Sequence, residues 1–442
     1  MLESLSLKNF KLHSSTAIEA RPVTVFIGPN NSGKSSIFHA FLTLRQAVGR
    51  GSVNLLNPVL RQPTNTEQLY LYPSGQEIDP GPFDSLVRKG QGSIEIEFRG
   101  SFQDQDATLG GLRKVTILVG LGRNQLTHHR GQIEYEIGGS GRFEGFNWDW
   151  VRGMDRLHIS PGGANLRGIA LTFEPVESFD FLTPGGFTSP PNFPQHELAE
   201  ISAFLTRISR APAAFLKSLH PVYPLRGLEE SAYPLPDDAA TNSDRMMLAD
   251  RTLALLSILA YKPEIEEQVS MWIGGLLGLR LKHRLITGKR VAIVAEPVGR
   301  HSPENLFVNE GTGAGQLPFI LVPIALCPSG ETVMISEPEV HLHPRAQSEL
   351  ARLFVRIAVE EKKQFILETH SEHVLNSLLH AVAKGDLNKA DLTIYYFESR
   401  ADATEVRRLV VDDYGRVEGG LPGFFDQSLT ELTEYLETLK KK

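Results

Sequence analysis

The chain has 442 residues, which is long enough for two or three compact regions around at least one large hydrophobic core. Hydrophobic residues make up 41% and charged residues 22%, an ordinary globular composition that argues against disorder. The formal net charge of −7 excludes a strongly basic protein, so nucleic acid would have to be bound by a local patch of Lys and Arg.

The sequence also indicates a compartment. The single cysteine, Cys327, cannot form an internal disulfide, and the N-terminal residues MLESLSLKNFKL lack the apolar core of a signal peptide. The longest apolar run, from Leu317 to Cys327, predicts a buried helix, because a bilayer span takes roughly 20 residues. We therefore expect a cytoplasmic protein without membrane contact.

The first predicted elements are two strands and a helix. LESLSLKNF alternates apolar and polar residues, whereas PVTVFIG is almost continuously apolar, as in a strand covered on both faces. SGKSSIFHAFLTLRQAV then has helical periodicity. A glycine loop thus lies between a buried strand and a helix.

The middle of the chain changes character twice. Residues 52–92 indicate loop with short elements, and IEIEF, VTILVGL, QIEYEIG and GIALTFEP then predict an antiparallel sheet. The proline- and glycine-rich residues 182–195 mark a boundary, after which a helical pattern dominates from about residue 196 to 282.

From residue 288 onwards, predicted strands and helices alternate. Strand RVAIVAE precedes a glycine-rich turn and an apolar helix; strand ETVMIS, helix RAQSELARLFVRIAVEE and strand QFILETH follow, which is typical of a parallel α/β sheet. We expect an N-terminal part with the first glycine loop and the antiparallel β region (1–180), a helical insertion or lid (181–287) and a C-terminal part (288–442). Internal repeats and long heptad runs are absent from the sequence.

The first glycine loop, GPNNSGKS, fits the phosphate-loop pattern G-x-x-x-x-G-K-[ST]. Backbone N–H groups and the helix N-terminus would face the phosphates of ATP, Lys34 would reach the β and γ phosphates, and the Ser35 hydroxyl would bind Mg²⁺. The alternative is a chance glycine turn. The expected nucleotide-binding residues here are Gly28, Asn30, Asn31, Ser32, Gly33, Lys34, Ser35 and Ser36.

Two other segments are harder to interpret from the residues alone. The glycine loop NEGTGAGQ, residues 309–316, precedes an apolar helix and could be only a structural turn. Glu339, His341 and His343 alternate as metal ligands on a strand would, but Pro338 and Pro344 make a continuous strand there unfavourable.

Taken together, these segments resemble the ATP-binding-cassette type of ATPase, in the soluble branch that includes the RecF, SMC-like and OLD families. The resemblance rests on LSLKNFK, GPNNSGKSS, EGTGAGQL, VMISEPEVHLHP and ETHSEH, in that order, at both ends of the chain but not in its middle. It implies a P-loop fold with a mostly parallel core sheet flanked by helices, ATP and Mg²⁺ as ligands, and a dimer closed by nucleotide.

The resemblance also assigns roles. Gly311, Gly313 and Gln316 belong to the signature loop that contacts the nucleotide of a second copy. Glu337 would activate the attacking water, and His370 would contact the γ phosphate. A structural acid and a strand-capping histidine are the alternatives. Residues 341–344 would lie in the D-loop at the dimer face, and the Q-loop glutamine stays open among Gln62, Gln68, Gln76 and Gln91.

Two positions depart from the family pattern. Gly311 stands where a serine is usual, so a hydroxyl that would contact the γ phosphate is missing. Ser336 stands where an acid usually supports Mg²⁺; its hydroxyl can still bind a metal-bound water but adds no negative charge.

The C-terminal segments DLTIYYFES, VRRLVVDDYGRV and LPGFFDQ resemble a prokaryotic AAA-family ATPase group that ends in a GFFD motif. The resemblance implies anti-phage defence with a separate effector protein, by association only. Arg226 and the residues Lys440 to Lys442 are most simply a surface arginine and a solvated helix end.

Three functions therefore stay open: a dimeric ATPase that acts as sensor and scaffold, a RecF-like repair ATPase that binds DNA, and a scaffold held together by ATP with little hydrolysis. Salt-sensitive stimulation by DNA would indicate the second. Tight ATP binding without phosphate release would indicate the third.

Overall fold

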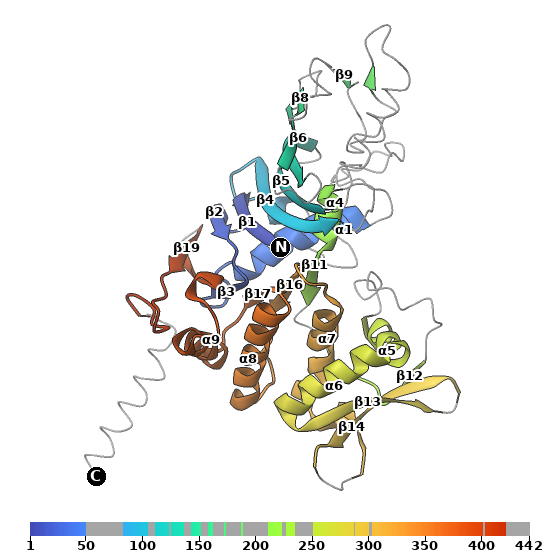
Figure 1. Ribbon diagram of the computed structural model, residues 1–442. Coiled ribbons are helices and arrows are strands. Elements are labelled where there is room, and N and C mark those ends of the chain that lie inside the picture. The colour runs from blue at the N-terminus through green and yellow to red at the C-terminus, as the bar shows by residue number, and fades with distance from the viewer. Residues whose placement is uncertain are drawn as a thin grey trace, which may run out of the picture.

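Figure 1 shows the computed structural model of the chain. It describes residues 1–49, 83–104, 111–122, 125–136, 143–151, 158–161, 172–173, 187–188, 211–222, 227–234, 251–286, 288–299, 303–400 and 403–420. Gln62, Gln68, Gln76, Arg226, the GFFD motif and residues 440–442, singled out in the sequence, lie outside these ranges.

A mostly parallel sheet forms the centre of the molecule, in the order β11-β16-β17-β3-β18-β19. Its first five strands run parallel, and β19 pairs antiparallel with β18, as the predicted α/β core requires. The strands are β3 (Val23–Ile27), β11 (Leu219–Val222), β16 (Thr332–Ser336), β17 (Gln364–Glu368), β18 (Leu392–Arg400) and β19 (Ala403–Leu409).

Two hydrophobic cores cover the two faces of this sheet. Alternate residues explain the division: Val25 joins one core and Phe26 the other, because successive side chains on a strand point to opposite faces. Helices α7 (Thr312–Leu326), α8 (Pro344–Glu360) and α9 (Glu372–Lys384) lie on the first face, and α1 (Lys34–Gly49) lies on the other (Figure 1). This double covering accounts for the almost continuous apolar run in β3.

The helices that follow the buried strands begin with clear signals. His343 caps α8, since its Nδ1 accepts a hydrogen bond from the backbone N–H of Arg345 at 3.3 Å, and Pro344 occupies the first turn. The Ser371 hydroxyl accepts from the N–H of Val374 at 3.1 Å and caps α9, which ends at Gly385 in the left-handed conformation.

Three of the four predicted antiparallel strands lie in a second sheet, in the order β2-β1-β4-β5-β6-β7-β8. Of the fourth, GIALTFEP, only Thr172 and Phe173 are among the described residues, and they pair outside this sheet. Its strands are β1 (Leu2–Phe10), β2 (His13–Glu19), β4 (Ser93–Asp104), β5 (Gly111–Gly122), β6 (Gln125–Glu136), β7 (Phe143–Val151) and β8 (His158–Pro161). The short helices α2 (Phe83–Leu86) and α4 (Ala211–Lys217) flank it, and β9 (Thr172–Phe173) pairs with β10 (Phe187–Thr188). The buried side of the sheet shares the second core with α1.

A third, small antiparallel sheet corrects one prediction. RVAIVAE, expected in the parallel sheet, is β14 (Arg290–Pro297), which pairs with β12 (Tyr233–Pro234), β13 (Leu279–Ile286) and β15 (Asn305–Leu306). Its residues from Val291 to Ala295 are all buried. Burial on both faces produces the same apolar run in either kind of sheet, so the run alone could not distinguish them.

The predicted helical insertion, residues 181–287, contributes strands as well as helices. It holds α5 (Arg251–Tyr261) and α6 (Pro263–Leu277), but its β11 joins the core sheet beside β16. Strands β13 and β14 form one hairpin across the predicted boundary at residue 287, so this boundary divides a structural unit. Across the described ranges, every helix is too short or too polar to cross a membrane.

Candidate nucleotide-binding site

The phosphate-loop sequence forms a tight turn between β3 and α1. Gly28 has φ +141°, and a Cβ at this position would lie 2.2 Å from the carbonyl oxygen of Phe397 on β18. A glycine is therefore required both by the backbone conformation and by the close approach of the neighbouring strand. The Thr404 hydroxyl of β19 donates to the Ser32 carbonyl at 2.9 Å and fixes the other side of the loop.

Lys34 lies within this turn, with only 3% of its surface exposed. Its Nζ donates to the carbonyl oxygens of Gly28 at 3.0 Å and Pro29 at 2.7 Å. Burial lowers the pKa of Lys34, and the negative charges of Glu368, Glu337 and Glu339 act in the opposite direction. The ammonium group is thus the positive centre of an acidic neighbourhood.

Glu368, which the sequence analysis did not single out, holds the centre of the site. It ends β17 and is 1% exposed. Its Oε1 accepts a hydrogen bond from the Ser35 hydroxyl at 2.5 Å, and its Oε2 accepts one from the Ser336 hydroxyl at 2.7 Å. Burial raises the pKa of Glu368, while the two hydroxyl donors and the charge of Lys34 lower it. The available signal was an acidic residue ending the apolar run QFILE.

Glu337 follows β16 directly and turns away from the strand. Its φ is +48°, which is rare outside glycine, and its N–H donates to the Glu368 carbonyl at 2.7 Å. His370 lies two residues after Glu368 and is half-buried. Burial lowers the pKa of His370, as does the charge of Lys34, whereas Glu337 raises it. Lys34, Glu337 and His370 are therefore close enough to affect one another electrostatically.

Glu339 links the segment after β16 to His370. It is 8% exposed, and its Oε1 accepts from the backbone N–H of His370 at 2.7 Å. Its Oε2 has no hydrogen-bond partner among the described residues, and burial raises the pKa of Glu339.

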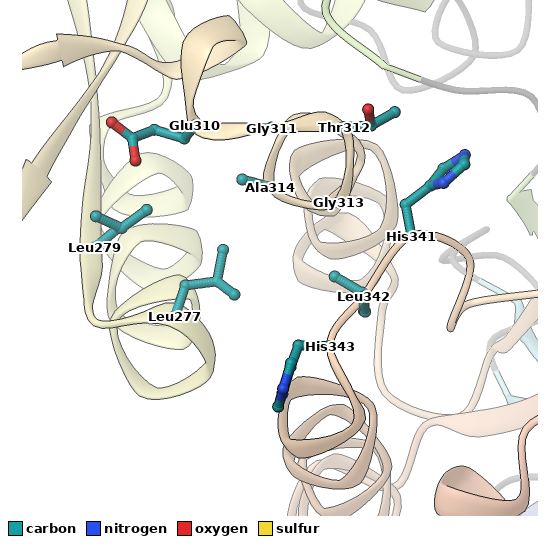
Figure 2. Close-up of a pocket in the computed structure, with 10 residues that line it drawn as sticks. All are labelled: Leu277, Leu279, Glu310, Gly311, Thr312, Gly313, Ala314, His341, Leu342 and His343. Atoms are coloured by element: carbon teal, nitrogen blue, oxygen red, sulfur yellow. The ribbon is translucent and has the colours of Figure 1, made fainter.

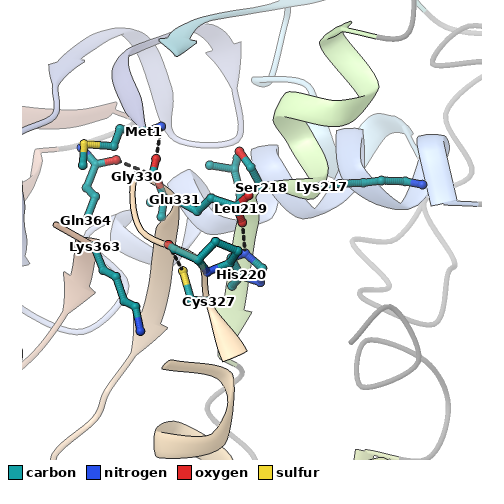
Figure 3. A network of polar contacts seen from close by, with 12 residues as sticks. Met1, Lys217, Ser218, Leu219, His220, Cys327, Gly330, Glu331, Lys363 and Gln364 are labelled. Carbon is teal, nitrogen blue, oxygen red and sulfur yellow. Dashed lines mark hydrogen bonds and ion pairs between the residues drawn. The ribbon is translucent and has the colours of Figure 1, made fainter. Parts of the chain in front are cut away.

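The structure does not bring Glu339, His341 and His343 together as metal ligands. His341 and His343 are exposed and point in opposite directions (Figure 2), and His343 caps α8. Among the described residues, the side chains that could together hold a metal ion are His220, Cys327 and Glu331 (Figure 3). There, His220 already pairs with Glu331 at 2.5 Å, and burial raises the pKa of the Cys327 thiol to about 12, which keeps it neutral.

The second glycine loop packs against the segment that follows Glu337. Gly311 precedes α7, and a Cβ on Gly313 would lie 2.2 Å from the His341 carbonyl oxygen. The Gln316 side-chain amide donates to the Val340 carbonyl. These contacts tie the start of α7 to residues 340–341.

A cavity of about 510 Å³ opens beside this loop (Figure 2). It is lined by Leu277, Leu279, residues 310–314 and residues 341–343. No residue of the phosphate loop lines it. Gly311 and Gly313 therefore face this cavity, away from the phosphate loop. The other predicted site residues, Lys34, Ser35, Ser336, Glu337 and His370, lie together at the ends of β3, β16 and β17.

Comparison with known families adds a match to the segments that form this site. The model described as "AAA ATPase domain" matches residues 1–71 and 305–375, which include both glycine loops and the ends of β16 and β17. The chain has a P-loop ATPase fold. A second model, described as "Protein of unknown function (DUF3696)", matches residues 387–434. Residues 72–304 lie outside both matches.

Solved structures similar to this chain include SMC head domains, each 14% identical in sequence. The SMC head domain from Thermotoga maritima has a TM-score of 0.40 over 92% of this chain and 98% of that one. A Smc head bound to the C-terminal domain of ScpA, derived from Pyrococcus furiosus, has a TM-score of 0.42 over 99% of each chain. These TM-scores are too low to bear on function. No curated protein sequence matches the chain.

Proposed function

We propose that the protein binds Mg²⁺-ATP and hydrolyses it to ADP and phosphate. The observation that carries this proposal is the gathering of Lys34, Ser35, Glu337 and His370 at the carboxyl ends of β3, β16 and β17. This set offers a cation for the phosphates, a hydroxyl for the metal, a carboxylate for water and an imidazole for the γ phosphate. Ligands of α/β sheets bind at this end of the strands.

The donor set fits Mg²⁺. Mg²⁺ prefers hard oxygen ligands, and the Ser35 hydroxyl would provide one beside the phosphate loop, where it donates a hydrogen bond to the Glu368 carboxylate. When bound, the ion would neutralise negative charge on the phosphate oxygens. The protein's own part is to hold the phosphates through Lys34 and the loop N–H groups, and to orient the attacking water through Glu337.

Two copies are proposed to close over two ATP molecules. Within one copy, the signature loop faces a cavity that shares no lining residue with the phosphate loop, so it is available to a second copy. Gly311 and Gly313 would meet the nucleotide of that copy through backbone N–H groups. Gly311 brings no hydroxyl, and we therefore expect this contact to be weaker than one made by a serine.

The finer proposal is a nucleotide-controlled sensor and scaffold in prokaryotic anti-phage defence, with a separate effector protein. The resemblance of the C-terminal segments to an ATPase group associated with anti-phage defence supports it, as an analogy between families. Co-purification of the chain with an effector in ATP, and its loss in ADP, would be the expected result. An effector that binds equally in both would contradict nucleotide control.

The central test measures phosphate release, ATP binding and oligomer mass for the wild type and Glu337→Gln. We expect the wild type to release phosphate, and the variant to bind ATP and dimerise but hydrolyse about 10²–10⁴-fold more slowly. Glu372→Gln, the same charge change at the start of α9, is the control. A wild type that binds ATP and dimerises without releasing phosphate would overturn hydrolysis and identify a scaffold held by ATP.

A further inference from the structure

Glu368 occupies a position between the two strands that form the site. In the sheet, it pairs in register with Ser336 on β16 and with Phe26 on β3, the strand that leads into the phosphate loop. Its carboxylate accepts from Ser336 at 2.7 Å on one oxygen and from Ser35 at 2.5 Å on the other. One buried carboxylate therefore joins the expected metal-binding hydroxyl to the end of β16.

The charge balance of the site makes this arrangement informative. P-loop ATPases support Mg²⁺ with the serine or threonine of the loop and with an acid at the end of the strand before the catalytic glutamate. In this chain, that position is Ser336, which carries no charge and donates its hydrogen bond to Glu368. Because Ser336 and Glu368 are direct neighbours in the sheet, the missing charge is present one strand away.

The burial of the Glu368 carboxylate is energetically unfavourable by itself and therefore calls for compensating interactions. Removing a charged group from water is costly unless it is paired or bound to a cation. The partners of Glu368 are two hydroxyl groups and the charge of Lys34, and Lys34 is itself expected to bind phosphate. The Ser35 side of this cluster is exposed, so a cation can reach it.

We propose that Glu368 supplies the negative charge that supports Mg²⁺ at Ser35, replacing an acid at position 336. Glu368 acts through the Ser35 hydroxyl and is thus a positioning residue for the metal. This inference rests on the proposed function, because it assumes that the loop binds Mg²⁺-ATP. The competing interpretation is that Glu368 only ties β17 to its neighbours.

The test measures metal affinity without turnover. All variants carry Glu337→Gln, and Mg²⁺ is titrated into protein with a fluorescent ATP analogue, with Mn²⁺ binding followed by electron paramagnetic resonance as a second readout. Glu368→Gln keeps the size of the side chain and an oxygen that accepts hydrogen bonds. We expect it to raise the metal concentration at half-saturation about 10–100-fold, the usual loss for an outer-shell partner. Analogue binding in EDTA should change less.

A charge relocation provides the decisive comparison. Glu368→Gln combined with Ser336→Asp restores one carboxylate to the cluster from the neighbouring strand, and we expect it to recover most of the lost metal affinity. A residue that only ties strands together would not be rescued by an acid on β16. Glu372→Gln, four positions along the chain at the start of α9, is the control for loss of one acidic charge.

The outcomes separate the two proposals. Unchanged metal affinity in folded Glu368→Gln, checked by circular dichroism and melting temperature, overturns the role of Glu368. A loss that Ser336→Asp fails to restore also overturns it, in favour of the structural tie. If the Glu337→Gln parent binds no analogue with or without metal, the proposed ATP site itself is wrong, and the inference falls with it.

Discussion

The Glu339 carboxylate accepts a hydrogen bond from the backbone N–H of His370, with Oε1 2.7 Å from the nitrogen. The bond joins the segment that leaves β16 to the residue that follows β17. Since the same segment contacts the second glycine loop through Val340 and His341, Glu339 connects His370 with the surface proposed to meet a second copy.

Two substitutions of Glu339 distinguish the contribution of its hydrogen bond to stability from the contribution of its negative charge. Glu339→Ala removes the acceptor of the His370 N–H, and we expect a loss of about 1–3 kcal/mol in the free energy of unfolding, measured in urea. Glu339→Gln keeps an acceptor oxygen, so its loss should be smaller. Equal losses in both variants would show that the charge, rather than the hydrogen bond, stabilises this position.

The contact between Gly313 and His341 leads to a paired prediction within one helix. Gly313→Ala would place a methyl group 2.2 Å from the His341 carbonyl oxygen, so we expect the two segments to separate, at a cost of about 1–3 kcal/mol. Gly315→Ala, whose nearest atom would be the Leu228 nitrogen at 3.8 Å, should be neutral or stabilising, since alanine favours helix. Thermal unfolding measures both, and a Gly313 variant as stable as the wild type would contradict the close contact.

We expect buried Lys34 to lower the stability of the folded protein while increasing its affinity for ATP. Its burial in the loop lowers its pKa, which means that the folded protein carries a poorly solvated charge. Lys34→Met should weaken ATP binding roughly ten- to hundredfold, the worth of hydrogen bonds to a charged group, without lowering the melting temperature.

Calorimetry and circular dichroism would measure these two effects of Lys34→Met. Lys8→Met, at an exposed lysine paired with Glu95, is the control and should leave ATP affinity unchanged. A large drop in melting temperature for Lys34→Met would mean that its bonds to the Gly28 and Pro29 carbonyls outweigh its desolvation.

The lowered pKa of His39 predicts that the free energy of unfolding depends on pH. Burial, and then the neighbouring charge of Lys11, lower the pKa of His39 to about 4; Lys11 Nζ lies 2.5 Å from His39 Nδ1. The unfolded state, with an ordinary histidine pKa of about 6.5, binds the proton first. Between these two values the free energy of unfolding therefore decreases as the pH falls.

The measurement for His39 is a difference between proteins. His39→Gln keeps an acceptor for Lys11 but cannot take up this proton, so the stability of the wild type relative to the variant should decrease from pH 7 to pH 4. His13 has a pKa lowered by burial in the same direction, but it is present in both proteins. A difference that stays constant over this range would contradict the lowered pKa of His39.

The sequence predicts the core sheet better than the peripheral elements. The apolar runs of β3, β16 and β17 are long enough to identify as buried strands, and the helices between them show their periodicity. Strand β11 consists of only LHPV, and β13 (LRLKHRLI) alternates apolar and polar residues only in its first half, so both strand patterns are weak. Their place depends on long-range pairing with β16 and β14, which no local pattern encodes.

The same distinction applies to the site. Spacing alone indicated Lys34 and Ser35, because the loop needs glycines, a lysine and a hydroxyl at fixed positions. The role of Glu368 could not be predicted from a motif, because its position beside Ser336 results from the register of two strands. The assignments of Glu337 and His370 to catalysis stay predictions, as does the metal role of Ser336.

The strand order has a consequence for how the protein is made. Strand β3, near the start of the chain, lies between β17 and β18, and Gly28 contacts Phe397. A nascent chain that has emerged from the ribosome only as far as residue 360 contains the phosphate loop but not the strands that flank it. We therefore expect the phosphate loop to reach its final conformation only after β17 and β18 have been synthesised, which makes this part of the core sheet form late.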